Sequence, residues 1–202
     1  MSHKIIALGR QFGSGGHEVG QALAKRLSIP CYDKELITLA ALHSNLHYSV
    51  FEDYDEHTAA PWVYELAYNQ NQNRPEGGSI SEVLFHLQQG IICSIAQQED
   101  AVIVGRCADE ILRENKEVSL LTVFIAAPFE YRVLRKMNQL NLSRRATERL
   151  VRRTDTQRSA YYQHYTGKLW GDPSRFDLYL DTSLLPQEDL LEEIISAYQN
   201  LK

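Results

Sequence analysis

Short apolar runs alternate along the chain with longer segments whose apolar residues recur at helical spacing. Residues 4–8, 101–104 and 120–125 are apolar and rich in β-branched side chains, which predicts strands covered on both faces. A further strand is predicted over residues 176–181. Strand, helix and strand in succession indicate right-handed crossovers, so we predict an α/β fold built on a parallel sheet flanked by helices.

Helical patterns lie between and after these strands. Apolar residues after the first strand follow the i, i+3, i+4 and i+8 spacing of a buried helical face: Val19, Ala22, Leu23 and Leu27. Residues 137–165 are interpreted as two helices with Ser143 as an N-cap between them. Residues 187–201 form an amphipathic helix that we expect to close the core.

Residues 43–90 break this alternation. They are acidic over 52–56, rich in Asn and Gln over 69–73, and have the composition of a loop over 74–78. We expect a helical insertion with a mobile turn. The chain of 202 residues is therefore interpreted as a single domain that carries an insertion at about 43–90.

The composition is that of a soluble globular protein, with 44% hydrophobic and 23% charged residues. No apolar stretch reaches the roughly 18 residues that cross a bilayer, and the N-terminus lacks the pattern of a signal peptide. The cysteines are Cys31, Cys93 and Cys107, an odd number without a C-x-x-C pair. They favour three small buried side chains in a reducing compartment, so we expect a cytoplasmic protein without a membrane partner.

The net charge of −5 is distributed unevenly. Residues 131–175 contain 11 Lys/Arg and 3 Asp/Glu, so the remainder of the chain is strongly acidic. A basic segment on an acidic body indicates an anionic ligand. Nucleic acid is one candidate, because Tyr161, Tyr162 and Tyr165 follow the arginines and could stack on bases. The acidic total and the lack of a recognisable module favour a smaller anion, and we predict no nucleic-acid partner.

The most informative segment follows the first strand and precedes the first helix: Gly13, Ser14, Gly15, Gly16 and His17. Glycines let backbone N–H groups converge, and a helix N-terminus adds partial positive charge, so this segment is a candidate phosphate cradle. The alternative is a tight turn without a ligand. The Walker pattern G-x-x-x-x-G-K-[ST] can be aligned with Gly15 as its second glycine or with Gly9 as its first, and neither alignment supplies its lysine. In the first alignment, Gly16 stands at the lysine position. Arg10 is the nearest substitute cation, and His17 is a weaker one.

Several segments together resemble the cytidylate kinase-like family, P-loop relatives of the nucleoside monophosphate kinases. They are residues 10–20, 32–36, 102–109, 152–158, 161–162, 165–168, 171–173 and 177–183. The resemblance implies a P-loop kinase-like fold, ATP and Mg²⁺ as cofactors, and a nucleoside monophosphate as phosphoryl acceptor, with CMP as the family-level choice. Ala126 and Ala127 depart from the family pattern, which has an acidic residue near the acceptor after this strand.

Arg106 follows a glycine at the predicted carboxyl end of a buried strand, where parallel sheets bind their ligands. A guanidinium can hold a phosphate with two hydrogen bonds. The resemblance implies that Arg106 holds the phosphate of the acceptor. The alternative is a structural arginine paired with Asp109 or Glu110.

An arginine-rich segment at about 141–172 is the candidate lid. Arg145, Arg149 and Arg153 share one helical face, and lid arginines stabilise the charge that builds up during phosphoryl transfer. Asp155 and Arg158 resemble the lid motif of cytidylate kinases, in which the carboxylate orients arginines. Four residues are therefore candidates for catalytic roles beside Arg10: Arg149, Arg153, Asp155 and Arg158.

Asp33 lies where the second strand would end. It is a candidate ligand of Mg²⁺ or of the acceptor, or else an N-cap for a helix starting near Lys34. The sequence contains no convincing set of protein metal ligands, so Mg²⁺ would be held mainly by nucleotide phosphate and water.

Three functions remain open at this point. The first is a nucleoside monophosphate kinase. The second is a nucleotide-binding regulatory module that has lost transfer, and the third is a kinase of another small molecule. The sequence makes no prediction about oligomeric state.

Overall fold

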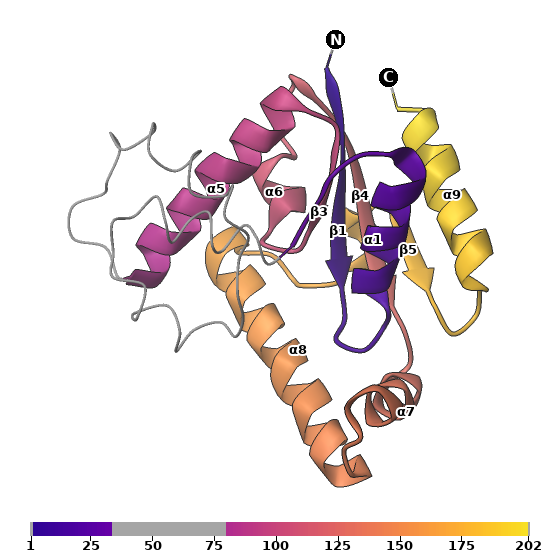
Figure 1. Ribbon diagram of the computed structural model, residues 1–202. Coiled ribbons are helices and arrows are strands. Elements are labelled where there is room, and N and C mark those ends of the chain that lie inside the picture. Colours follow the sequence, from indigo (N-terminus) through magenta and orange to yellow (C-terminus); the bar gives the residue numbers. More distant parts are fainter. Residues whose placement is uncertain (1, 34–79, 202) are drawn as a thin grey trace, which may run out of the picture.

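The computed structural model describes residues 2–33 and 80–201. Its centre is a five-stranded sheet in the order β2-β3-β1-β4-β5, with every neighbouring pair parallel (Figure 1). The strands are β1 His3–Arg10, β2 Cys31–Tyr32, β3 Ala101–Val104, β4 Val118–Ala126 and β5 Leu178–Asp181. The predicted parallel α/β architecture is confirmed. The last strand starts at Leu178, since Phe176 and Asp177 precede it outside the ladder.

Helices cover both faces of the sheet, as Figure 1 shows. Helices α1 Gly16–Leu27 and α9 Gln187–Gln199 pack on one face, and α5 Ile80–Gln98 and α6 Ala108–Ile111 pack on the other. The alternation along β1 explains this, because Ile6 and Leu8 enter the first core whereas Ile5 and Ala7 enter the second. The predicted first and last helices are thus confirmed, while the short α6 was not predicted.

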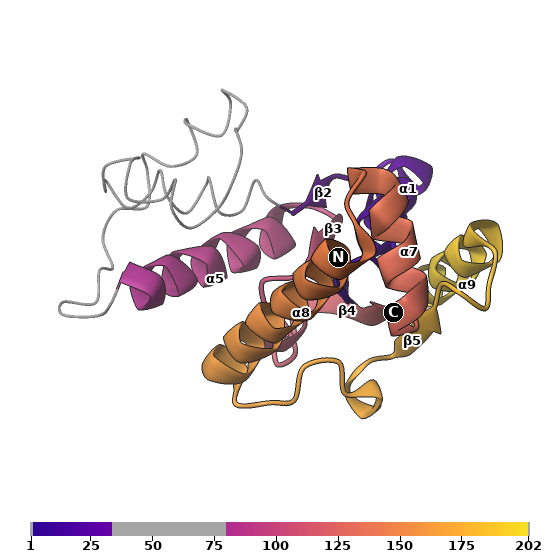
Figure 2. The ribbon, with the colours of Figure 1, turned by 90° about the horizontal axis from the view of Figure 1, so that it is seen from below.

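Two further helices, α7 Phe129–Leu140 and α8 Arg144–Thr166, lie beyond the carboxyl edge of the sheet (Figures 1 and 2). The predicted N-cap is confirmed, because the Ser143 hydroxyl accepts a hydrogen bond from the Ala146 N–H at 3.4 Å. The prediction that the first of these helices begins at residue 137 was wrong. It begins directly after Pro128, a residue that favours the start of a helix.

Residues 80–90 of the predicted insertion belong to α5, and residues 43–79 lie outside the described part of the chain. The predicted lid segment consists mostly of α8, whose C-cap is Gly167 with φ of 67°. A short 3-10 helix, η2 Pro173–Arg175, follows it. Within residues 2–33 and 80–201, none of the helices has both the length and the apolar character needed to cross a membrane.

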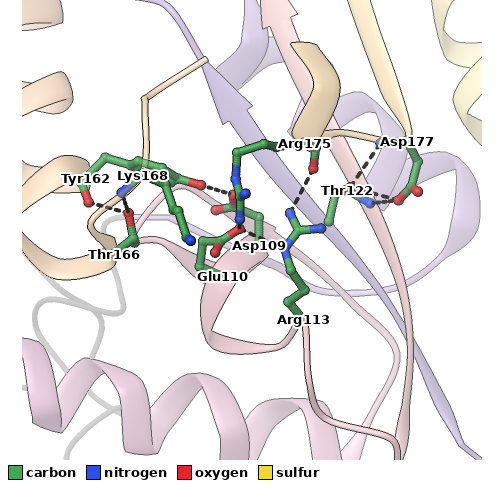
Figure 3. A network of polar contacts seen from close by, with 9 residues as sticks. All are labelled: Asp109, Glu110, Arg113, Thr122, Tyr162, Thr166, Lys168, Arg175 and Asp177. Carbon is green, nitrogen blue, oxygen red and sulfur yellow. Dashed lines mark hydrogen bonds and ion pairs between the residues drawn. The ribbon is translucent and has the colours of Figure 1, made fainter. Parts of the chain in front are cut away.

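A polar network joins the carboxyl end of α8 to α6 and η2 (Figure 3). The Tyr162 hydroxyl donates to Asp109 Oδ2 at 2.6 Å. Glu110 accepts from Arg113 at 2.7 Å and from Arg175 at 2.5 Å. Because these residues come from three elements, the network fixes α8 relative to the chain that follows β3.

Candidate active site

A cleft of about 740 Å³ lies at the carboxyl ends of β1 and β3. Parallel sheets bind their ligands at this edge. Five cationic side chains line the cleft together with three carboxyl groups: Arg10, Arg106, Arg135, Lys136 and Arg158, with Glu18, Asp33 and Asp109. The cations come from β1, the turn after β3, α7 and α8, so the fold gathers positive charge from distant parts of the sequence.

The glycine-rich loop forms one wall of this cleft, through Gly13, Gly15, Gly16 and His17. Gly13 and Gly15 have φ of 83° and 90°, a conformation that glycine adopts without strain. Gly15 is the N-cap of α1, so the N–H groups of the next two residues have no carbonyl partner within the helix. Ser14 is placed differently from its neighbours, because it is buried and donates to the Gln11 carbonyl at 2.9 Å.

The position of the missing lysine has no room for a side chain. A Cβ atom on Gly16 would lie 2.5 Å from Arg10 Cβ and 3.3 Å from Ile125 Cβ. Real Cβ atoms do not approach other atoms this closely. The stem of Arg10 therefore fills the space that a side chain at position 16 would need.

We expect Gly16→Lys to weaken nucleotide binding rather than to restore a working Walker loop. Overpacking against Arg10 and Ile125 should destabilise the protein by about 1–3 kcal/mol and distort the loop. Urea denaturation and a nucleotide titration check both effects. Gly90→Lys is the control, because a Cβ on Gly90 meets nothing within 4 Å. Tighter nucleotide binding by Gly16→Lys would contradict the expectation.

The Arg10 side chain is buried in the cleft wall and is bonded to Asp33. Its Nη2 donates to Asp33 Oδ1 at 2.8 Å. Its Nη1 lies 2.0 Å from where a Cβ on Gly105 would stand, so this approach requires glycine there. Burial lowers the pKa of Arg10, against the opposing effect of Asp33. Asp33 directly follows β2, as expected. The N-cap alternative involves residues that lie outside the described part of the chain.

The turn after β3 adopts an uncommon conformation at three consecutive residues. Gly105, Arg106 and Cys107 have φ of 83°, 56° and 57°. Non-glycine residues in this region cost free energy and tend to occur at functional sites. The Arg106 guanidinium lies 5.9 Å from the centroid of the Tyr161 ring. Burial raises the pKa of Cys107 to about 12, so its thiol stays protonated and is not a nucleophile.

The two carboxylates that the sequence offers as structural partners for Arg106 bond to other residues. Asp109 accepts from Tyr162, and Glu110 accepts from Arg113 and Arg175. Burial raises the pKa of Asp109.

Arg158 reaches the same cleft from α8. Its Nη1 donates to the Arg10 carbonyl at 3.0 Å, and its guanidinium lies 5.8 Å from the Phe12 ring centroid. Burial, and then the charge of Arg10, lower the pKa of Arg158 to about 10. Crowded and partly desolvated cations of this kind are stabilised by an anion placed among them.

Asp155 bonds to Phe12 and Arg132, and its charge also acts on Arg158, one of the arginines for which the sequence proposed it. Its Oδ1 accepts from the Phe12 N–H at 2.8 Å, and its Oδ2 pairs with Arg132 Nη1 at 2.5 Å. Arg132 also donates to the Phe12 carbonyl at 3.0 Å and to the Ala127 carbonyl at 2.9 Å. Helices α7 and α8 therefore clamp both backbone polar groups of Phe12, at the entrance to the glycine-rich loop.

Arg149 and Arg153 do not line the cleft. Both are exposed on α8, whose buried face contains Thr147 and Val151. Residues spaced by four share one face of a helix, and this face of α8 is exposed at both positions. The proposed role of Arg149 and Arg153 as lid arginines stays a prediction.

Two cations that sequence reasoning missed lie directly against the loop. Arg135 donates to the Gly13 carbonyl at 3.4 Å and pairs with Glu18 at 3.1 Å. Lys136 Nζ lies 4.9 Å from the Phe12 ring centroid, and burial lowers its pKa. Pro128 was the signal in the sequence, because it favours the start of a helix directly after it. A helix that starts there places Arg135 and Lys136 beside the glycine-rich loop.

Comparison with known proteins identifies relatives of this chain. The model of the cytidylate kinase-like family matches residues 5–184. A cytidylate kinase from Methanocaldococcus jannaschii is 32% identical over 109 residues, which is 54% of this chain and 61% of that protein. The match therefore spans less than two thirds of that relative.

Solved structures support the same assignment at the level of the fold. An uncharacterised protein from Eubacterium ventriosum has a TM-score of 0.72 at 26% identity, covering 98% of this chain and 99% of its own. A shikimate kinase from Bacteroides thetaiotaomicron has a TM-score of 0.55 at 13% identity, covering 98% and 99%. The latter shares only the fold, a parallel sheet flanked by helices as in P-loop kinases. Because the family model extends from β1 through β5, the chain belongs to the cytidylate kinase-like family.

Proposed function

We propose that this protein transfers the γ-phosphoryl group of ATP to a nucleoside monophosphate, with CMP as the first acceptor to test. The observation that carries the proposal is the cleft itself. A glycine-rich loop at a helix N-terminus faces cations from four separate elements, in a cleft whose volume lies in the range of small-molecule sites. Membership of the cytidylate kinase-like family supports a kinase.

Two groups of cations suggest how donor and acceptor would be divided. Arg135 and Lys136 adjoin the glycine-rich loop, where the donor phosphates would bind. Arg106 and Arg158 act on Arg10 through their charges and would hold the acceptor phosphate and the group in transfer. Catalysis would consist of positioning and charge stabilisation, without a covalent enzyme intermediate.

The divalent cation of such a reaction neutralises phosphate charge. In the part of the chain that the structure describes, no group of three or more His, Cys, Asp and Glu residues could hold a metal ion. The cation would therefore be bound mostly by phosphate and water. The hydroxyl that follows the lysine in a Walker loop is absent, because His17 stands there. The side chain at position 17 thus offers a nitrogen donor, whereas Mg²⁺ prefers oxygen ligands.

We expect Lys136→Ala and Arg135→Ala each to weaken ATP binding by about tenfold, roughly 1.4 kcal/mol, because each removes a partly buried charge beside the loop. Isothermal titration with a non-hydrolysable ATP analogue measures the effect. Lys25→Ala is the control, since Lys25 is exposed in the last turn of α1. An unchanged affinity in both cleft variants would contradict the proposed donor site.

A nucleotide-binding module without transfer is the second candidate. The observation that favours it is Gly16, whose surroundings leave no room for the catalytic lysine. The two functions are separated by incubating the purified protein with ATP, a divalent cation and a panel of nucleoside monophosphates while ADP formation is followed. Turnover with a monophosphate supports the kinase. Saturable ATP binding without turnover on any acceptor overturns it in favour of the module.

A further inference from the structure

His17 occupies a special position in the proposed nucleotide site, and any role for it as a cation ligand rests on that proposed function. It is the second residue of α1 and lines the cleft, with 47% of its side chain exposed. When Gly15 is taken as the second glycine of the Walker pattern, position 17 is that of the Ser or Thr whose hydroxyl contacts the nucleotide-bound Mg²⁺. An imidazole therefore stands where an oxygen ligand is usual.

The ring of His17 is held by a carboxylate. His17 Nδ1 lies 2.8 Å from Asp33 Oδ2, and the other oxygen of Asp33 accepts from Arg10 at 2.8 Å. Because a carboxylate only accepts hydrogen bonds, Nδ1 carries the proton that Asp33 receives. In the neutral ring this leaves Nε2 with its lone pair available. Metal-ligating histidines are oriented in this same way by a carboxylate on their other nitrogen.

The chemistry of this donor distinguishes among divalent cations. Mg²⁺ binds oxygen ligands and keeps much of its water, whereas imidazole nitrogen favours first-row transition metals in the order Mn²⁺, Fe²⁺, Co²⁺, Ni²⁺. The metal ligands in this site would be one imidazole nitrogen, phosphate oxygens and water. Co²⁺ accepts such a mixed ligand set more readily than Mg²⁺ does.

We propose that His17 ligates the divalent cation of the bound nucleotide through Nε2, oriented by Asp33, and that this shifts the cation preference of the site from Mg²⁺ towards first-row transition metals. In this arrangement Asp33 acts as a positioning residue. Asp33 also bonds to Arg10, so it links the metal-binding His17 to the arginine whose stem fills the space of the missing lysine.

The test measures nucleotide binding rather than turnover. The full chain is titrated with a non-hydrolysable ATP analogue at about pH 8, where free imidazole is neutral, without divalent cation and with Mg²⁺ or Co²⁺. We expect the wild-type protein to bind the Co²⁺ complex at least about tenfold more tightly than the Mg²⁺ complex. His17→Ser, which supplies the Walker hydroxyl, should abolish this preference.

His164→Ser is the matched control, because His164 is exposed on α8 and does not line the cleft. It should keep the preference for Co²⁺. A second readout needs no variant: the visible absorption of the Co²⁺ complex should change on binding to the wild-type protein, as nitrogen replaces an oxygen ligand.

Three results would overturn the inference. Equal affinity of the wild-type protein for the Mg²⁺ and Co²⁺ complexes is one. An unchanged preference in His17→Ser is the second, and it would leave His17 as a simple ion-pair partner of Asp33. Both leave the proposed function standing. If no nucleotide binds under any cation condition, the proposed function fails, and the inference fails with it.

Discussion

Arg158→Ala is expected to lower the rate of phosphoryl transfer by about a thousandfold or more. An arginine that stabilises the charge on the migrating phosphoryl group contributes about 10³–10⁵-fold in phosphoryl-transfer enzymes. Arg158 is mostly buried in the cleft beside Arg10, where low local polarity strengthens such an interaction. Initial rates of ADP formation with the best monophosphate acceptor measure the loss, which should fall on kcat more than on KM for ATP.

Arg153→Ala and Arg26→Ala complete this experiment. Arg153 is exposed on α8 outside the cleft, and Arg26 pairs with Glu188 on the surface. Both variants should retain nearly the wild-type rate. An equal loss in Arg153→Ala would show that α8 moves during the reaction and brings its exposed arginines over the cleft. An unchanged rate in Arg158→Ala would remove Arg158 from the proposed mechanism.

Arg132→Ala is expected to destabilise the protein by about 3–5 kcal/mol, because it leaves one partner of a buried ion pair without its countercharge. The side chains of Arg132 and Asp155 are only 7% and 18% exposed. The substitution also removes the hydrogen bonds to the Phe12 and Ala127 carbonyls. Urea denaturation measures the free energy of unfolding, and nucleotide affinity should fall as well because the glycine-rich loop loses its support.

Arg144→Ala provides a matched comparison between the same two helices. Arg144 pairs with Glu130 of α7 and Glu148 of α8, but its side chain is 54% exposed. Exposed pairs contribute little to stability, so this variant should unfold almost as the wild-type protein does. Similar losses in the Arg132 and Arg144 variants would mean that burial does not set the strength of the Phe12 clamp.

The fold was predictable because its strands have a strong local signature. The apolar runs of β1, β3 and β4 are buried on both faces, and each is too short to be confused with a helix. The start of α7 was missed because Ala126, Ala127 and Pro128 resemble a turn. That error concealed Arg132, Arg135 and Lys136, which owe their places in the site to the register of this helix.

The site was only partly predictable for a second reason. The glycine-rich loop is local, so its residues follow from a short segment of sequence. The partners of Asp155 and Arg10 lie across the tertiary structure, and periodicity cannot determine which residue a carboxylate meets. Helical spacing grouped Arg149 with Arg153, but only the packing of α8 determines which face meets the cleft.

The left-handed turn at Gly105, Arg106 and Cys107 has a consequence for attempts to improve the protein by selection. An L-residue in this conformation costs about 1–2 kcal/mol relative to an unstrained one, and glycine at position 106 would recover much of that cost. A library screened only for thermal tolerance should therefore enrich Arg106→Gly, and each such clone would lack the guanidinium proposed to hold the acceptor. Screens that score heat resistance and catalysis together should keep the arginine, so the two kinds of screen should select different residues at position 106.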